Sequence, residues 1–310
     1  MSTHMENDSK EKVRIFCVDH RPEGWDNPAG LTTIGVGKCR RPGVLHDNVG
    51  ENISDLNPHL NEVTALYWVW KHPEVRQSEF VGFCHYRRFL DFHPVRSRRA
   101  NAASGIWLNY LYTPTEAALR KACIKPEDAK ALLRRFPCDG FLPVNWVYPI
   151  DMPIAKRVRG GASEKWRRRL FELLREAKAP CADFIEQAFL TRADVFLCNL
   201  FLVRTELFEQ MCETLYPVLL KLTTEWQADP EPKINSREPG YLAEFLTGTY
   251  WTWLEETRQA HFLKGQALSP STCGHGLWYV WARRFAYRFF PDRLIAQTFL
   301  RKRGKVETGI

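Results

Sequence analysis

The chain has 310 residues, of which 45% are hydrophobic and 13% aromatic, and its formal net charge is +8. This composition supports a packed core, which excludes a disordered or fibrous protein, and the length fits one large domain or two small ones. No stretch approaches ~18 consecutive apolar residues, so no transmembrane helix is predicted. Residues 1–12 are polar and predict a disordered start rather than a signal peptide.

The nine cysteines are scattered along the sequence, and none of them forms a C-x-x-C pair. This spacing argues against a zinc ribbon and against a disulfide framework. It favours free thiols in a reducing cytosol.

Hydrophobic periodicity predicts strands that alternate with helices. The expected fold is therefore α/β, a mostly parallel sheet flanked by helices with a more helical C-terminal part. In chain order we predict a strand at 13–19, a strand at 32–36, a loop at 43–58, a helix at 58–71, a strand at 79–86, a basic loop at 93–113, a helix at 125–135, a strand at 138–144, a basic loop at 150–163, helices at 164–177 and 182–190, a strand at 194–203, and helices at 206–222 and 240–256.

The predicted strand at 79–86 ends abruptly in charged and polar residues. Its apolar run is followed by His85, Tyr86, Arg87 and Arg88. In open α/β sheets, ligands bind at the carboxyl ends of strands. Arginine there suits a phosphate, because its planar fork gives two parallel charge-assisted bonds. The alternative is a strand end whose arginines reach solvent or pair with carboxylates.

The C-terminal segment holds nearly all of the excess positive charge. Residues 281–305 contain eight Lys or Arg against Asp292 alone, interleaved with aromatic residues from Trp278 onward. Such a mixture suits an anionic membrane surface. A helix with its aromatic side packed on the body is the main alternative, and nucleic acid is the least favoured partner.

Four segments together form a familiar pattern that spans residues 13–255. They are Ile15–Pro22 (IFCVDHRP), the stretch from Asp47 to Lys71 (DNVGENIS…EVTALYWVWK), Gly82–Phe89 (GFCHYRRF), and the pair NLFL at 199–202 with REPGYLAE at 237–244. The chain resembles a bacterial family first catalogued as a domain of unknown function in capsule and O-antigen gene clusters. That family is regarded as glycosyltransferases, with galactofuranosyl transfer among its activities. The chain departs from the pattern at Phe245, where the family usually has arginine, and residues 93–190 match only loosely.

The resemblance implies a GT-A type glycosyltransferase, a Rossmann-like domain over residues 13–256 followed by a basic aromatic extension at 257–310. Most such folds hold a divalent metal on the diphosphate with an Asp-x-Asp pair, and this sequence has none. We therefore expect arginines to neutralise the diphosphate, with no metal and no other cofactor. A divalent metal is the less favoured alternative.

The resemblance also implies roles for donor-site residues. His20 and Arg21 follow the first strand, where GT-A folds receive the nucleotide, although a simple strand-end turn is the alternative. Asp47 and Asn52 lie in the loop before a helix, where they either hold the donor or cap turns through their own backbone. The predicted donor site comprises His20, Arg21, Asp47, Asn52, His85, Tyr86, Arg87 and Arg88.

Transfer with inversion needs a base for the acceptor hydroxyl, and a positioned carboxylate contributes about 10²–10⁴-fold in rate. Glu244 is the predicted base, Asp91 is the second candidate, and a paired helix carboxylate is the alternative for Glu244. Asn199, Arg237 and Tyr241 are predicted to bind the acceptor. Asn199 would orient a sugar hydroxyl or join two loops, and Tyr241 would stack on a sugar or pack in the core. Outside this set, Glu62 lies in an aromatic helix, where we expect a buried partner for an arginine, with a role in the site as the alternative.

The sequence thus predicts a cytoplasmic glycosyltransferase, peripheral to the inner membrane, that moves a hexose from a UDP-sugar to a lipid-linked capsule or O-antigen glycan. The hexose could be galactofuranose, and other glycosyltransferases are candidate partners, whereas nucleic acid is not favoured. The alternatives are another nucleotide-dependent transferase and a non-catalytic glycan- or nucleic-acid-binding module. Against the first, the sequence contains no Gly-rich phosphate loop and no kinase signature.

Overall fold

The computed structural model describes residues 11–21, 30–92, 111–112, 123–143, 146–147, 162–192, 194–195 and 199–269. Residues 1–10, most of the two predicted basic loops and the basic aromatic segment 278–305 lie outside the described residues. Glu11 and Lys12, which the sequence analysis placed in a disordered start, belong to the first strand.

A mixed sheet forms the centre of the molecule, and most of its strand pairs are parallel. Its strands are apolar runs with both faces covered, as expected for parallel strands between helices. Along the sheet the order is β3 (Leu45–His46), β2 (Thr32–Gly35), β1 (Glu11–Asp19), β4 (Ser78–His85), β10 (Phe201–Arg204), β7 (Gly140–Pro143), β11 (Phe262–Ser269) and β5 (Phe89–Asp91), with β6 (Leu111–Tyr112) also paired to β11. A separate two-stranded sheet joins β8 (Trp146–Val147) to β9 (Asp194–Val195).

The register aligns the ends of the strands that matter for the site. β1 and β4 are parallel, with Val18 opposite His85, so the segments after Asp19 and after His85 leave the same edge of the sheet. β10 runs antiparallel to β4, with Phe201 opposite Phe83. The residues just before Phe201 therefore approach that same edge.

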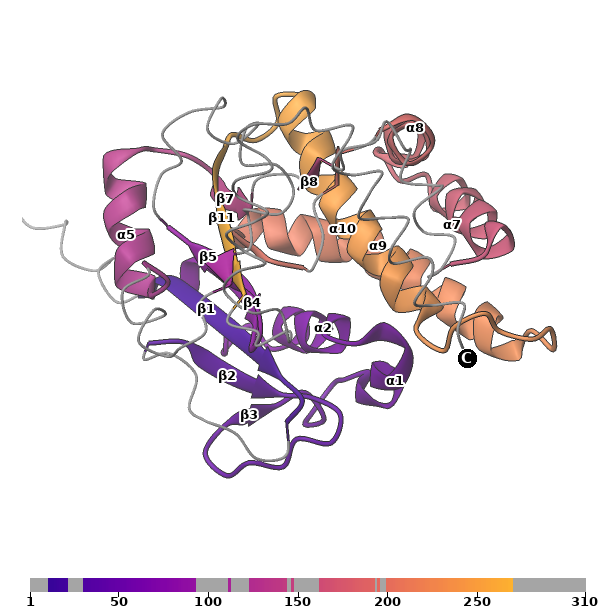
Figure 1. Ribbon diagram of the computed structural model, residues 1–310, viewed down its shortest axis with the longest axis horizontal. Helices are drawn as coiled ribbons and strands as arrows, with labels where there is room; N and C mark the ends of the chain where they lie inside the picture. Colours follow the sequence, from indigo (N-terminus) through magenta and orange to yellow (C-terminus); the bar gives the residue numbers. More distant parts are fainter. Residues whose placement is uncertain are drawn as a thin grey trace, which may run out of the picture.

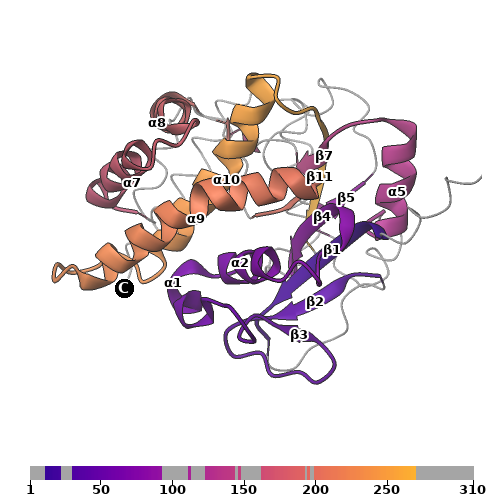
Figure 2. The ribbon, with the colours of Figure 1, turned by 180° about the vertical axis from the view of Figure 1, so that it is seen from behind.

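Helices cover both faces of the sheet, as predicted. Figures 1 and 2 show α5 on one side and α2, α9 and α10 on the other, with α7 and α8 packed outside α9 and α10. Buried aromatic rings join the second layer to the sheet, for example Phe83 with Phe208 at 5.3 Å and Phe201 with Trp251 at 5.2 Å between ring centroids. The helices are η1 (Ser54–Leu56), α1 (Asn57–Leu60), α2 (Val63–Lys71), α5 (Pro126–Arg135), α7 (Glu164–Glu176), α8 (Ala182–Thr191), α9 (Thr205–Ala228) and α10 (Glu238–Glu256).

Two predicted elements are interrupted at asparagines with left-handed backbones. The predicted helix at 58–71 is divided into α1 and α2 by Asn61, whose φ is +53° and whose carbonyl accepts bonds from the Asn57 and Thr64 side chains. The predicted strand at 194–203 is divided into β9 and β10, and Asn199 at φ +45° precedes β10. Asparagine tolerates this conformation better than most residues.

No strand is predicted from the sequence after residue 256, and this prediction is wrong. Strand β11 runs parallel to β7 and antiparallel to β5 in the sheet, so residues 262–269 complete the domain instead of extending it. Gly265 fits against Phe141 and the Asp91 carbonyl, where a Cβ atom would lie only 2.0 Å from the Phe141 ring. The pairing depends on this close approach between segments distant in sequence.

Candidate active site

Strand β1 ends in a buried carboxylate that is paired with two arginines. Asp19 is fully buried; it accepts bonds from the Arg21 backbone and guanidinium, the shortest at 2.6 Å, and from Arg41 at 3.0 Å. Burial alone would raise the pKa of Asp19, but the Arg21 hydrogen bonds and both positive charges outweigh it, and the pKa is lowered. Asp19 therefore acts as an anchor that fixes Arg21 over the Tyr86 ring, 4.4 Å from its centroid.

Strand β4 ends in a tight turn that presents Tyr86 and Arg87. The backbones of His85 and Arg88 exchange two hydrogen bonds, and the Tyr86 N–H donates to the Val18 carbonyl of β1. The turn is therefore closed by its own backbone bonds and fixed to β1, at the edge of the sheet where β1 and β4 end. This agrees with the predicted position of the His85–Arg88 segment.

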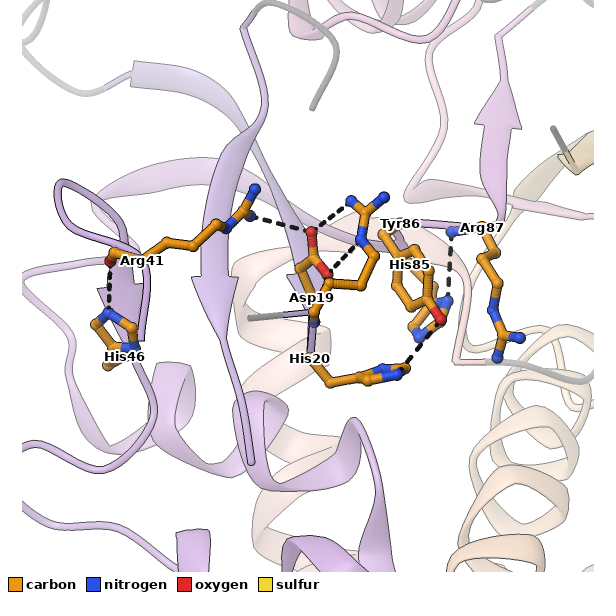
Figure 3. A network of polar contacts seen from close by, with 8 residues as sticks. Asp19, His20, Arg41, His46, His85, Tyr86 and Arg87 are labelled. Atoms are coloured by element: carbon orange, nitrogen blue, oxygen red, sulfur yellow. Dashed lines mark hydrogen bonds and ion pairs between the residues drawn. The ribbon is translucent and has the colours of Figure 1, made fainter. Parts of the chain in front are cut away.

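The side chains after β1 and β4 gather into one group. Figure 3 shows His20, His85, Tyr86 and Arg87 beside one another, with Asp19 and Arg41 to one side. The Tyr86 hydroxyl lies 3.5 Å from His20 Nε2, the His85 and Tyr86 rings are 4.3 Å apart, and the Arg87 guanidinium lies 5.0 Å from the Tyr86 centroid. Donor-site residues predicted from two separate motifs are thus brought together.

The electrostatics of this group favour an anion. Burial, followed by the charges of Arg88 and Arg87, lowers the pKa of His85 to about 2. Partial burial and the charge of Arg87 also lower the pKa of His20, and Arg237 contributes in the same direction. Both imidazoles are therefore neutral at pH 7, while the surrounding cations come from β4 and from the start of α10. The Asp19 carboxylate acts in the opposite direction on both imidazoles, and it is itself paired with Arg21 and Arg41.

Close packing of the start of α10 explains how Arg237 reaches this group. A Cβ atom on Gly240 would lie 2.7 Å from the His59 carbonyl and from the Asn61 amide, so only glycine fits against α1. His59 Nδ1 contacts the Ser236 carbonyl at 2.8 Å. These contacts hold the first turn of α10 against α1.

Glu238 is a structural anchor that the sequence analysis did not identify. Its carboxylate is 1% exposed and accepts bonds from the Trp226 indole of α9 and the Ser163 backbone before α7. Loss of such a buried acceptor leaves two donors unsatisfied, at a cost of about 1–3 kcal/mol each. Nothing in the sequence marks this residue, because its partners lie on other helices.

Three predicted site residues, Arg237 just before α10 and two within it, lie on one side of the helix start. Arg237, Tyr241 and Glu244 are spaced four and three residues apart, which places them on the same face. Arg237 and Tyr241 are exposed and Glu244 is half-buried. Tyr241 is therefore not a core residue, whereas Trp251 and Trp253 of the same helix are buried.

Two predicted donor residues have structural partners instead. Asp47 is 2% exposed and accepts a 2.6 Å bond from the Thr64 hydroxyl, and burial raises its pKa. Asn52 accepts bonds from the backbone and hydroxyl of Ser54 and donates to the Gly50 carbonyl, so it shapes its own turn. The donor role of each remains a prediction.

Asp91 and Asn199 lie in different surroundings. Asp91 is 8% exposed in β5, where its backbone pairs with Gln266 of β11, and its role as a base remains a prediction. Asn199 is 3% exposed and donates from Nδ2 to Glu62 Oε1 at 3.2 Å. Glu62 is thus paired with an amide rather than with the arginine that the sequence analysis considered.

The described side chains at the ends of β1 and β4 are not the ligands that a divalent cation prefers. Metal sites of this kind need carboxylate oxygens, but β4 ends in imidazole and guanidinium groups, and the Asp19 oxygens are held by arginines. Among the described residues, no group of three or more His, Cys, Asp or Glu is arranged to hold a metal.

A hollow of about 420 Å³ lies at the opposite edge of the sheet, between the start of β4 and the start of α9. A buried arginine of its lining, Arg76, is bonded to Glu209 and to the carbonyls of Val69 and Trp70. These bonds give Arg76 a structural role. The candidate site residues that follow β1 and β4 lie at the other edge of the sheet.

The fold and the positions of the motifs agree with a known family. The family described as "Domain of unknown function (DUF4422)" matches residues 14–258. The chain belongs to the DUF4422 family. This confirms the resemblance carried by the four sequence segments, all of which lie inside the matched region.

A solved structure shows the same fold as this DUF4422 chain. It is the apo structure of WbbM, a bifunctional glycosyltransferase, with a TM-score of 0.69 and 25% sequence identity over 84% of this chain. The match covers 46% of the WbbM chain, so this protein spans about half the length of that relative. A comparison with proteins of curated function finds none that is significantly similar.

Proposed function

We propose that this protein is a glycosyltransferase that uses a UDP-sugar donor. The observation that carries the proposal is the cationic group at the ends of β1 and β4 and the start of α10, where the charges of Arg87 and Arg237 act on the neutral imidazole of His20, and Arg87 also acts on that of His85. A diphosphate supplies the negative charge that this group lacks. The shared fold with a glycosyltransferase supports the same assignment.

In this mechanism the arginines stabilise the leaving group. The bond between the sugar C1 and the diphosphate oxygen breaks as the acceptor oxygen forms its bond to C1 from the opposite side. Negative charge develops on the departing diphosphate, where preorganised positive groups have their largest effect. Arg87 and Arg237 would take this role without a metal ion, and the neutral His20 ring can donate a hydrogen bond.

Glu244 is proposed as the base that removes the acceptor proton. It lies on the same stripe of α10 as Arg237 and Tyr241, so an acceptor lying along this face would reach both the carboxylate and the donor. Direct displacement with the proton taken by Glu244 inverts the configuration at C1 and releases UDP.

The proposed reaction is tested by measuring UDP release from UDP-galactofuranose and UDP-galactopyranose in EDTA, with and without a galactan acceptor. Release that continues in EDTA supports a metal-independent transferase. Loss of release that Mn²⁺ or Mg²⁺ restores would show that a metal is required. Salt-sensitive binding of oligonucleotides without any release would favour a binding module instead.

The acceptor is proposed to be a lipid-linked surface glycan at the inner membrane. No helix in the described part of the chain is long and apolar enough to cross a bilayer. The proposal rests on the basic aromatic sequence at 278–305, which suits anionic lipids. Deletion of residues 281–310 should abolish sedimentation with anionic vesicles, and unchanged sedimentation would contradict membrane contact through this segment.

Donor binding should strengthen as the pH falls from 7.5 to 5.5. Burial and the charge of Arg87 lower the pKa of His20 in the free protein. A bound diphosphate offsets that positive charge and raises this pKa, so binding takes up protons and is favoured at lower pH. The donor affinity should rise by less than about tenfold per pH unit, because the uptake of one proton cannot produce a steeper dependence.

Calorimetry with a UDP-sugar checks this dependence, because its diphosphate diester does not titrate in the same range. The His20→Asn variant should bind with a flatter pH profile. A profile identical to that of the wild type would show that His20 does not contact the diphosphate.

A further inference from the structure

The amide of Asn199 has a buried hydrogen-bonding atom without a partner. Its Nδ2 donates to Glu62 Oε1, while its Oδ1 has no partner among the residues that the structure describes. The carboxylate fixes this orientation, because the flipped amide would turn oxygen toward oxygen. Buried acceptors are nearly always satisfied, so an unpaired one calls for an explanation.

The backbone at Asn199 is also unusual. Its φ of +45° is uncommon for a residue other than glycine, and such conformations concentrate at ligand sites. The left-handed turn directs a side chain that is 97% buried toward Glu62 at the start of α2. Two independent observations, the unpaired oxygen and the left-handed backbone, therefore coincide at one residue.

The pair formed by Glu62 and Asn199 lies beside the cationic group. In the antiparallel pair of β10 and β4, Phe201 lies opposite Phe83. Asn199 is two residues before Phe201 and His85 is two residues after Phe83, so both lie at the same edge of the sheet. Glu62 directly follows Asn61, and the Asn61 side chain packs against Gly240. Gly240 lies one helical turn after Arg237. The pair is thus flanked by the same two elements that supply the arginines.

The chemistry of the pair is that of a hydroxyl-binding site. The Glu62 carboxylate and the Asn199 amide oxygen are adjacent hydrogen-bond acceptors. They suit neighbouring O–H donors, whereas a phosphate offers only acceptors and would be repelled by the carboxylate. In a nucleotide sugar the hydroxyl-bearing ring follows directly after the diphosphate. We propose that Glu62 and Asn199 bind adjacent hydroxyls of the donor sugar, an inference that rests on the proposed function.

Calorimetry can separate sugar recognition from nucleotide recognition. The titrants are UDP, UDP-galactofuranose, UDP-galactopyranose and UDP-glucose, added to wild type, Glu62→Gln and Asn199→Gly. Glycine keeps the positive φ without strain and removes the amide. Glu206→Gln, an exposed carboxylate in the first turn of α9 at the opposite edge of the sheet, is the matched control.

Both variants should bind UDP as the wild type does, within about twofold, and should lose about tenfold or more in affinity for the UDP-sugar that the wild type prefers. The control should change neither affinity. Unchanged UDP-sugar affinity would overturn the inference, as would equal losses for UDP and UDP-sugar, or a loss of turnover without any loss of binding. A wild-type protein that binds none of the four ligands would overturn the proposed function itself, and the inference with it.

Discussion

Replacement of Arg87 by alanine is expected to weaken UDP-sugar binding by about 10- to 100-fold. The Arg87 residue is exposed, and its guanidinium lies over the Tyr86 ring, 5.0 Å from the ring centroid. Hydrogen bonds to charged groups contribute about 1.5–3 kcal/mol each, so loss of one such bond to the diphosphate gives an effect of this size. Calorimetry or the Michaelis constant for the donor measures it.

Two comparisons make the Arg87 experiment specific. Arg87→Lys should recover part of the affinity, because lysine keeps the charge but loses the planar fork. Arg134→Ala removes an exposed arginine of α5, on the other face of the sheet, and should have no effect. Equal donor affinity in the wild type and Arg87→Ala would contradict the placement of the diphosphate at the end of β4.

The Glu244→Gln variant is expected to lose about 10²–10⁴-fold in kcat while its affinity for the UDP-sugar stays close to that of the wild type. Glutamine keeps the size of the side chain but cannot accept the acceptor proton. Transfer rates at saturating donor, together with donor affinities from calorimetry, separate these two quantities.

The control for Glu244 is Glu255→Gln in the last turn of the same helix. This change breaks an ion pair with Lys264 but lies three turns from the site, so kcat should not fall. If Glu244→Gln keeps its activity and Asp91→Asn loses it, the base is Asp91 and the assignment to α10 is wrong.

Local sequence patterns predicted those parts of the site that lie at the end of a single strand. The apolar run before His85 predicts both a buried strand and its exposed end, because these are properties of adjacent residues. The same reasoning placed His20 and Arg21 after β1. The parallel register of β1 and β4 then brought the two strand ends together, as an α/β sheet requires.

Contacts between distant segments could not be predicted in the same way. Asn199 and Glu62 are 137 positions apart. Glu238 accepts hydrogen bonds from Trp226 of α9 and from the backbone of Ser163 just before α7. Hydrophobic periodicity carries no information on such pairs, so the sequence did not predict the amide partner of Glu62 and did not mark Glu238. Strand β11 was missed for a related reason, since it is defined by pairing with β7 and β5.

The most direct test of the account is a thermal-shift comparison of UDP, GDP, CMP and their sugars, each with and without EDTA. A ligand that binds only the folded protein raises its melting temperature by mass action. We expect a shift that is selective for UDP and its sugars, that persists in EDTA and that is lost in Arg87→Ala. The absence of a shift with any nucleotide, or a shift that EDTA abolishes, would contradict an arginine-based nucleotide-sugar site.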